Sequence, residues 1–249
     1  MTRKYYRYFF LTLLIYPLFS QAENEPFCYF EPPKGWNISH PGIHSSHVKI
    51  GFVAPWKKGF APSINLAIEH AEISLQEYVQ TVKQLHLSDA ACQYYSMGNF
   101  PLSFGPAHLA QIDIKNEYGD VRILQLLAKY QNYAIIVTAA TLKKDFFAFK
   151  DTFFHCFHSL KAFPDFDQSI NKEEKEKLEK VQENILSTLR QKNLAQMEKY
   201  SLLQEKEFIK FWKPMEKYLQ ANFSHLGAFW QILAMQKLQE ELKLSLQKK

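Results

Sequence analysis

A strict alternation of apolar and polar residues from Ala107 to Asn116 constrains the fold more than any other feature of this 249-residue chain. Ala110, Ile112 and Ile114 fall on one side of the alternation, and Asp113 is among the polar residues of the other side. A period of two is typical of a strand with one buried face. We therefore predict a strand here, in a sheet that covers an apolar core.

Short turns divide the sequence that follows into further strands. The stretch from Asn116 to Asp120 contains Gly119, which is free to adopt a positive φ, so a hairpin should return the chain from Val121 to Lys129. After a second turn, the run from Tyr133 to Thr141 is almost continuously apolar and β-branched. This pattern predicts a central strand that is covered on both faces.

Two amphipathic segments can cover the sheet. Ser74 and Glu77 match a capping box at the start of a helix that continues to His86. Asp145 can cap a second helix, which should end before Pro164. The apolar stripe of this second helix consists of Phe146, Phe149, Phe153, Phe157 and Leu160. Further strands are predicted from His47 to Val53 and from Ile64 to Glu69, with a short strand or edge element between Gln93 and Phe104.

Residues 1–22 have the layout of a secretory signal peptide. They begin with three basic residues, Arg3, Lys4 and Arg7. An apolar core from Phe9 to Phe19 follows, and Ser20 and Ala22 are small residues at the two positions that a signal peptidase reads. The apolar run is shorter than the ~20 residues of a membrane span, so cleavage after Ala22 is favoured over an uncleaved anchor. We expect a periplasmic or secreted protein with no stable membrane span after cleavage.

The net charge argues against a nucleic-acid partner. The first 22 residues contain three basic residues and no acidic one, so their removal leaves 227 residues and lowers the formal charge from +5 to +2. Binding of nucleic acid requires a concentrated basic surface, which a nearly neutral chain does not indicate. The hydrophobic fraction of 47% is sufficient for a core in one or two domains.

Three cysteines, Cys28, Cys92 and Cys156, allow one disulfide in an oxidising compartment. Their spacing does not determine the pairing. Cys156 lies within a phenylalanine-rich segment, where a buried thiol that packs as a small apolar side chain is favoured. If a bridge forms, we predict that it joins Cys28 to Cys92.

The character of the sequence changes beyond Pro164. A linker from 164 to 171 precedes a region from 172 to 249, where Asn171 and Glu174 can cap a helix. Apolar stripes then follow in three helical pieces, the second bent or restarted near Pro214. A lone helix cannot bury such stripes, so we predict an antiparallel helical hairpin or small bundle. Its candidate partner surface is Phe208, Phe211, Trp212, Phe229 and Trp230. The alternative for Trp212 and Trp230, which their helical spacing favours, is simple core filling.

Several short motifs together resemble the PsbP-like fold superfamily. They are Pro33-Lys34-Gly35-Trp36, Ile64 to Leu66, Glu77 to Val79, Tyr133 to Ile135 and Phe157 to Leu160. The resemblance implies an α+β fold over residues 23–163, with an antiparallel sheet sandwiched between helices in an α/β/α arrangement. It also implies a binding or assembly module without an established catalytic centre. The all-α region from 172 to 249 departs from the minimal domain of this superfamily, and no functional residue of the superfamily is carried over.

Sequence motifs for catalysis are weak. His40, His44 and His47 cluster before the first predicted strand and are the candidate metal ligands, with His155 and His158 on the closing helix as a further pair. They are not accompanied by a Cys-x-x-Cys pair or a His-Glu-x-x-His helix, so no metal or cofactor is predicted. The sequence has no Gly-x-Ser-x-Gly elbow and no glycine-rich phosphate loop. Asp113 and Glu117, near the hairpin end, are interpreted as solubility groups.

These observations favour an exported, non-enzymatic binding or assembly factor of the bacterial cell envelope, with an unidentified protein partner. In this hypothesis the sheet is a scaffold and the C-terminal helices supply the partner surface. One alternative is a metal-binding periplasmic protein or enzyme that uses His40, His44 and His47. Another is a secreted effector that binds a host protein.

Overall fold

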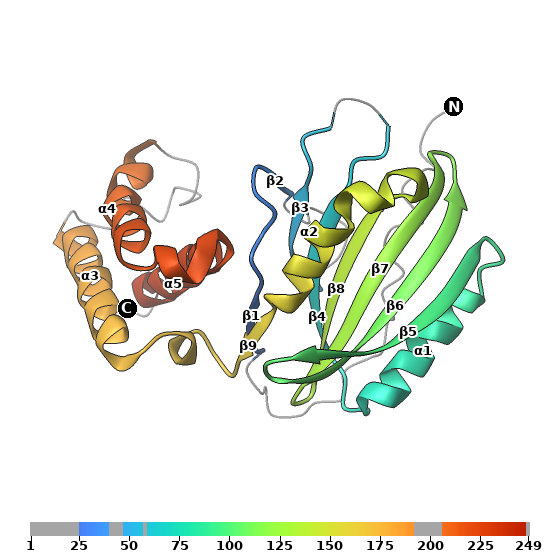
Figure 1. Ribbon diagram of the computed structural model, residues 1–249. Coiled ribbons are helices and arrows are strands. Elements are labelled where there is room, and N and C mark those ends of the chain that lie inside the picture. The colour runs from blue at the N-terminus through green and yellow to red at the C-terminus, as the bar shows by residue number, and fades with distance from the viewer. Residues whose placement is uncertain (1–24, 40–46, 57–58, 192–205, 248–249) are drawn as a thin grey trace. The chain divides into compact units, whose positions relative to one another are not determined.

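The computed structural model describes residues 25–39, 47–56, 59–191 and 206–247, so the predicted signal segment lies outside it. The chain divides into two compact units, Met1–Ala162 and Phe163–Lys249. Each unit has its own buried apolar residues and is described separately below (Figure 1).

The first unit is built on a seven-stranded antiparallel sheet with the order β2-β3-β4-β8-β7-β6-β5. Its strands are β2 (Asn37–Ser39), β3 (Val48–Val53), β4 (Ser63–His70), β5 (Cys92–Leu102), β6 (Gly105–Asn116), β7 (Gly119–Tyr130) and β8 (Tyr133–Leu142). Two short strands, β1 (Phe27–Tyr29) and β9 (Lys161–Phe163), form a separate two-stranded sheet, and neither they nor β2 were predicted from the sequence. The predicted central strand is confirmed, because β8 is the fourth of the seven strands.

The predicted hairpin joins β6 to β7. Gly119 has a φ of +115° and closes a turn in which the side chain of Asn116 accepts a hydrogen bond from the amide of Tyr118 at 2.9 Å. Because Asn116 is opposite Gly119, the register places Asp113 opposite Arg122. The turn therefore determines which side chains meet across the two longest strands of the sheet.

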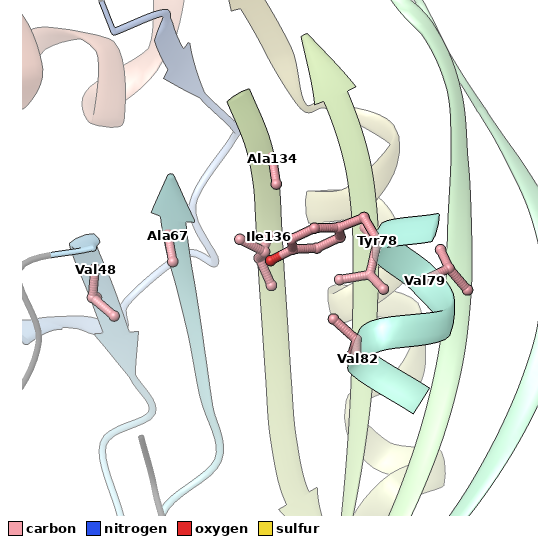
Figure 2. Packing of buried hydrophobic residues seen from close by; sticks show 8 residues of the cluster. Val48, Ala67, Tyr78, Val79, Val82, Ala134 and Ile136 are labelled. Carbon is pink, nitrogen blue, oxygen red and sulfur yellow. The ribbon is translucent and has the colours of Figure 1, made fainter. Parts of the chain in front are cut away.

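Helix α1 (Leu75–Leu87) covers one face of the sheet. The predicted capping box is confirmed, because Ser74 Oγ accepts from the amide of Glu77 and Glu77 Oε2 accepts from the amide of Ser74. Tyr78, Val79 and Val82 are the buried residues of the helix. Figure 2 shows them directed toward the strands, where they pack in a cluster with Val48, Ala67, Leu127, Ala134 and Ile136.

Helix α2 (Phe146–His158) lies on the opposite face, where its predicted phenylalanine stripe is largely buried. Asp145 does not cap this helix, contrary to the prediction. It is the last residue of a 3₁₀ turn (Lys143–Asp145) and has φ −96° and ψ −3°, whereas a capping residue usually has an extended backbone. With a helix on each face, the predicted α/β/α arrangement is confirmed.

The second unit contains α3 (Lys172–Gln191), α4 (Lys206–Asn222) and α5 (Gly227–Gln247), which confirms the predicted C-terminal helices. Asn171 and Glu174 exchange side-chain to backbone hydrogen bonds of 2.9 and 3.0 Å at the start of α3, as predicted. Helix α4 continues through Pro214 and does not restart there. Among the described residues, no helix is both long and apolar enough to cross a membrane.

The core of the second unit is centred on Trp230. Its ring stacks between Phe166 and Phe223, with ring centroids 5.3 and 5.0 Å away. Its Nε1 donates a hydrogen bond of 2.8 Å to Ser169 Oγ, which in turn donates to the carbonyl of Phe166. The buried indole thus has two stacked aromatic neighbours and a hydrogen-bonded polar atom.

Candidate binding face

The described chain leaves part of the α2 side of the sheet uncovered. Figure 1 shows α2 crossing in front of β8, with the ribbons of β6 and β5 uncovered beside it. Arg122 is on the α2 side of the sheet, because its guanidinium carbon lies 5.0 Å from the ring centre of Phe146 in α2. The strand register then identifies the residues of β5 and β6 whose side chains are on the same side. We define the open face as the residues that the register places on this side, Gln93, Tyr95, Gln111, Asp113 and Arg122, together with Met97 in the bulge of β5, Lys143 beside Asp113 and the exposed Phe147 next to Phe146.

Asp113 is the polar centre of the open face. Arg122 donates two hydrogen bonds of 2.8 Å to its carboxylate, and Lys143 Nζ lies 2.9 Å from Oδ2. The amide of Gln111 donates a longer one of 3.3 Å. The hydrogen bonds from Arg122, reinforced by Lys143, hold the pKa of Asp113 below its usual value, although burial opposes this shift. One carboxylate is therefore shared by two cations.

Large side chains border this centre. The exposed fractions are 48% for Tyr95, 50% for Met97 and 74% for Phe147. The hydroxyl of Tyr95 donates to Gln93 Oε1 at 2.9 Å, and Lys150 Nζ lies 5.9 Å from the ring centre of Phe147. Aromatic side chains, methionine and arginine are the residue types enriched in protein interfaces relative to the rest of the surface.

Strand β5 forms the outer edge next to the open face. The predicted edge element is confirmed, but it is an 11-residue strand and not a short one. A bulge between Ser96 and Gly98, which contains Met97, interrupts its register with β6. Bulges and prolines both limit uncontrolled pairing of an edge strand with another chain. Strand β5 has both features, because it also contains Pro101.

The opposite side of β5 and β6 carries a small hollow. Ser96 Oγ lies 3.2 Å from His108 Nε2, and burial lowers the pKa of this imidazole. The hollow holds about 150 Å³ and is lined by Leu75, Gln76, Val79, Gln80, Asn99 and His108. Ligand pockets usually hold about 300–1,000 Å³, so we interpret the hydroxyl and the imidazole as a cross-strand polar pair.

The candidate metal site is only partly described. His40 and His44 lie outside the described residues, and His47 is partly buried, with its carbonyl accepting from the amide of Ile68 at 2.9 Å. In the ranges that the structure covers, no three histidine, cysteine or acidic side chains gather as metal ligands. His155 lies 2.9 Å from Glu31. The second histidine of α2, His158, lies over Phe100 with ring centroids 4.5 Å apart.

All three cysteines of the chain are free in the structure, which does not contain the predicted Cys28–Cys92 disulfide. Cys28 belongs to β1 of the two-stranded sheet, whereas Cys92 begins the outer strand of the seven-stranded sheet. The interpretation of Cys156 as a buried thiol is confirmed. Burial raises the pKa of Cys156 to about 12 and that of Cys92 to about 11, so both thiols stay protonated at neutral pH.

The proposed helical partner surface needs correction at two positions. The side chains of Phe208, Phe211 and Trp212 lie outside the described part of the chain. Phe229 and Trp230 have no exposed surface, because they fill the core of the second unit. The core-filling alternative therefore holds for Trp230.

Asp113 was wrongly interpreted as a solubility group. Its side chain is buried, and its carboxylate is neutralised by Arg122 and Lys143. The alternation pattern alone assigned Asp113 to the polar side of a strand, without a partner. The signal that could have identified its partner is the turn, because a hairpin closed by Asn116 and Gly119 places Asp113 opposite Arg122.

Comparisons with known proteins give similarities of structure only. No protein-family model matches the chain, and neither does any curated protein. A solved structure of LpqN, described as involved in cell envelope biogenesis of Mycobacterium tuberculosis, is 14% identical with a TM-score of 0.44 and covers 56% of this chain and 84% of its own. Cyanobacterial PsbP (CyanoP) from Synechocystis sp. PCC 6803 is 11% identical with a TM-score of 0.40 and covers 60% of this chain and 99% of its own.

A third similar structure is a protein of unknown function from Pseudomonas aeruginosa, PA94, described as a putative regulator. It is 11% identical with a TM-score of 0.40 and covers 50% of this chain and 94% of its own. Likenesses at this level carry no information about partners or chemistry.

Proposed function

We propose that the protein is an exported, non-enzymatic binding or assembly factor of the bacterial cell envelope, and that its open face contacts a protein partner. The observation that carries this proposal is the exposure of Tyr95, Met97 and Phe147, by 48%, 50% and 74%, on the strand and the helix that lie next to one buried ion cluster. Aromatic and methionine side chains are enriched in protein interfaces, where they contribute most of the binding energy when covered. The signal segment of residues 1–22 supports the cellular location.

The chemistry of the polar centre favours binding over catalysis. A general acid or base works best with a pKa near the working pH and with access to the substrate. Asp113 has a lowered pKa and accepts hydrogen bonds from Arg122 and Gln111. Its carboxylate is suited to positioning Arg122 and Lys143, and poorly suited to transferring a proton.

Site-specific photocrosslinking tests the binding proposal. A photoreactive residue is placed at Tyr95, Met97 or Phe147 of the full chain in growing cells. Exposed positions Gln84 on α1 and Asn37 on β2 serve as matched controls. We expect one common crosslinked protein from the three open-face positions and none from the controls. Crosslinks that arise equally from all five positions, or only from the controls, would contradict the proposal.

Export is tested separately on the same full chain with a C-terminal epitope. We expect the tagged protein in the envelope fraction and a mature N-terminus at Glu23. A protein that retains Met1 and stays in the cytoplasm would contradict the envelope role. Release of the mature protein into the medium would instead favour a secreted effector.

A further inference from the structure

The polar centre of the open face contains more positive than negative charges. Two cations, Arg122 and Lys143, converge on the single carboxylate of Asp113. The exposed fractions of the side chains are 9% for Asp113, 16% for Arg122 and 48% for Lys143. The carboxylate is thus enclosed by its two partners. The centre has one positive charge in excess, and Lys143 is its most solvent-exposed group.

Apart from Glu117, the other charges around the open face occur as neighbours of opposite sign. Lys115 is opposite Asp120 in the hairpin, and Lys150 Nζ lies 4.0 Å from Asp151 Oδ1. Strand β5 contributes no charged residue. The remaining charged groups are Lys144 and Asp145, adjacent in the turn before α2, and Glu117 in the hairpin turn beyond the strand ends. Within the described face, the uncompensated cation is therefore that of the polar centre.

Apolar surface lies directly beside this cation. Phe147 is exposed and follows Lys143 by four residues at the start of α2. On the other side of the centre, Tyr95 lies on β5 opposite Gln111, two residues from Gln93, which is opposite Asp113. A ligand that reaches Lys143 will consequently also meet an aromatic side chain.

We infer that the open face binds an acidic segment of a protein partner, which deepens the proposed function and rests on it. A carboxylate of the segment occupies the exposed side of Lys143, next to Arg122, and a neighbouring apolar side chain packs against Phe147 and Tyr95. A carboxylate is the complement of a cation pair, because charge-assisted hydrogen bonds from lysine and arginine are stronger than neutral ones. Complementary charge also suppresses basic competitors.

The shape of the charge distribution favours a peptide over other anionic partners. A nucleic acid presents several phosphates and requires several uncompensated cations, whereas this centre provides one. A flat lipid surface would meet protruding Phe147 and Lys143 but not the guanidinium of Arg122, which is only 16% exposed. A single carboxylate on a flexible chain can enter between these groups.

Binding of synthetic copolymers to the full mature chain tests this inference. The probes are fluorescein-labelled poly(Glu,Tyr) and, as the charge-reversed counterpart, poly(Lys,Tyr). We expect measurable anisotropy change with poly(Glu,Tyr), weakening with added salt, and at least about tenfold weaker binding for Lys143→Glu. Phe147→Ser should weaken binding without altering the salt dependence. Lys83→Glu and Leu87→Ser on α1 are the matched controls and should change affinity less than about twofold.

A second variant keeps the result interpretable. Lys143→Gln removes the charge but leaves Asp113 paired with Arg122, so its circular dichroism and melting temperature should match those of the wild type. The inference is overturned if the wild type fails to bind poly(Glu,Tyr), if poly(Lys,Tyr) binds equally well, or if Lys143→Gln binds poly(Glu,Tyr) as tightly as the wild type does. Binding to phosphatidylglycerol vesicles that depends on Lys143, without binding to poly(Glu,Tyr), would assign the face to a lipid surface instead.

The crosslinking experiment separates failure of this inference from failure of the proposed function. If Lys143→Gln still yields the common crosslinked protein from Tyr95 and Met97 at the wild-type level, the binding face stands and the acidic character of the partner is wrong. If the wild type yields no common product, the proposed function itself fails.

Discussion

Arg122 donates its Nε and Nη2 hydrogens to the two carboxylate oxygens of Asp113, each at 2.8 Å, from the directly opposite position on the neighbouring strand. The same guanidinium lies over the ring of Phe146, the first residue of α2. This pair therefore joins the hairpin of β6 and β7 to the helix that covers it. It serves the fold and also orients the cations of the open face.

Substitution of Arg122 by Ala should destabilise the first unit strongly. Asp113 would keep Lys143 but lose both hydrogen bonds of the guanidinium, and a hydrogen bond to a charged group typically contributes about 1.5–3 kcal/mol. We expect this loss in the free energy of unfolding, measured with urea at neutral pH. Lys49→Ala is the matched control, because its pair with Glu25 is largely solvated and should contribute less than about 1 kcal/mol. Equal losses in the two variants would show that the Asp113 pair is no more important than a surface pair.

His86 should make the stability of the first unit depend on pH. Its Nε2 lies 3.4 Å from Gln125 Oε1, and its ring stacks over Tyr94 with centroids 6.2 Å apart. Burial lowers the pKa of His86, and the contact with Gln125 offsets this only in part. The folded protein therefore binds a proton at this site more weakly than the unfolded chain, whose histidine pKa is about 6.5. Stability consequently falls as the pH drops below this value.

The substitution His86→Phe retains a ring against Tyr94 and removes the titrating group. We expect the free energy of unfolding of the wild type to decrease relative to that of the variant between pH 7.5 and pH 5. Thermal unfolding at several pH values, followed by near-ultraviolet circular dichroism, measures this difference. A constant difference over the whole range would exclude a contribution of His86 to the pH dependence.

The parts of the fold that were predicted correctly depend on local patterns. The apolar run of β8, the glycine turn between β6 and β7 and the capping box of α1 each lie within one short segment, where spacing determines the structure. The errors concern contacts between segments. The burial of Asp113 depends on a residue nine positions away in the next strand, and the pairing of β1 with β9 joins segments more than 130 residues apart.

The candidate face was missed for a related reason. Each of Tyr95, Met97 and Phe147 is unremarkable in its own segment, and periodicity does not indicate which face of an edge strand a distant helix leaves open. The aromatic stripe of α2 was predicted, but Phe147 lies outside that stripe, and only the fold brings the start of α2 to Arg122. Side-chain exposure on an incompletely covered sheet is a property of the tertiary structure.

Trp230 and Ser169 should be energetically coupled in the second unit. Trp230→Phe removes the donor of the 2.8 Å hydrogen bond and part of the stacking with Phe166 and Phe223. Ser169→Ala leaves the buried indole Nε1 without its acceptor, which typically costs about 1–3 kcal/mol. In the double variant neither group remains unpaired, so the combined loss should be smaller than the sum of the single losses. Urea unfolding of the full chain, followed through α-helical circular dichroism, measures the cycle, and simple additivity would contradict the coupling.

Thr141 should tolerate an apolar replacement although it is fully buried. Its hydroxyl is one of two buried side-chain polar atoms in the described residues for which no hydrogen-bond partner is found, and the register places it opposite Arg122. Valine has nearly the same shape and removes a polar atom that gains nothing from burial. We expect Thr141→Val to leave the free energy of unfolding unchanged or to raise it by about 1 kcal/mol. Ser169→Ala removes a bonded hydroxyl and should lower stability. A comparable loss of stability in Thr141→Val would mean that the hydroxyl has a hydrogen-bond partner in solution. Arg122, which is opposite Thr141 on β7, would then be the first candidate partner to test.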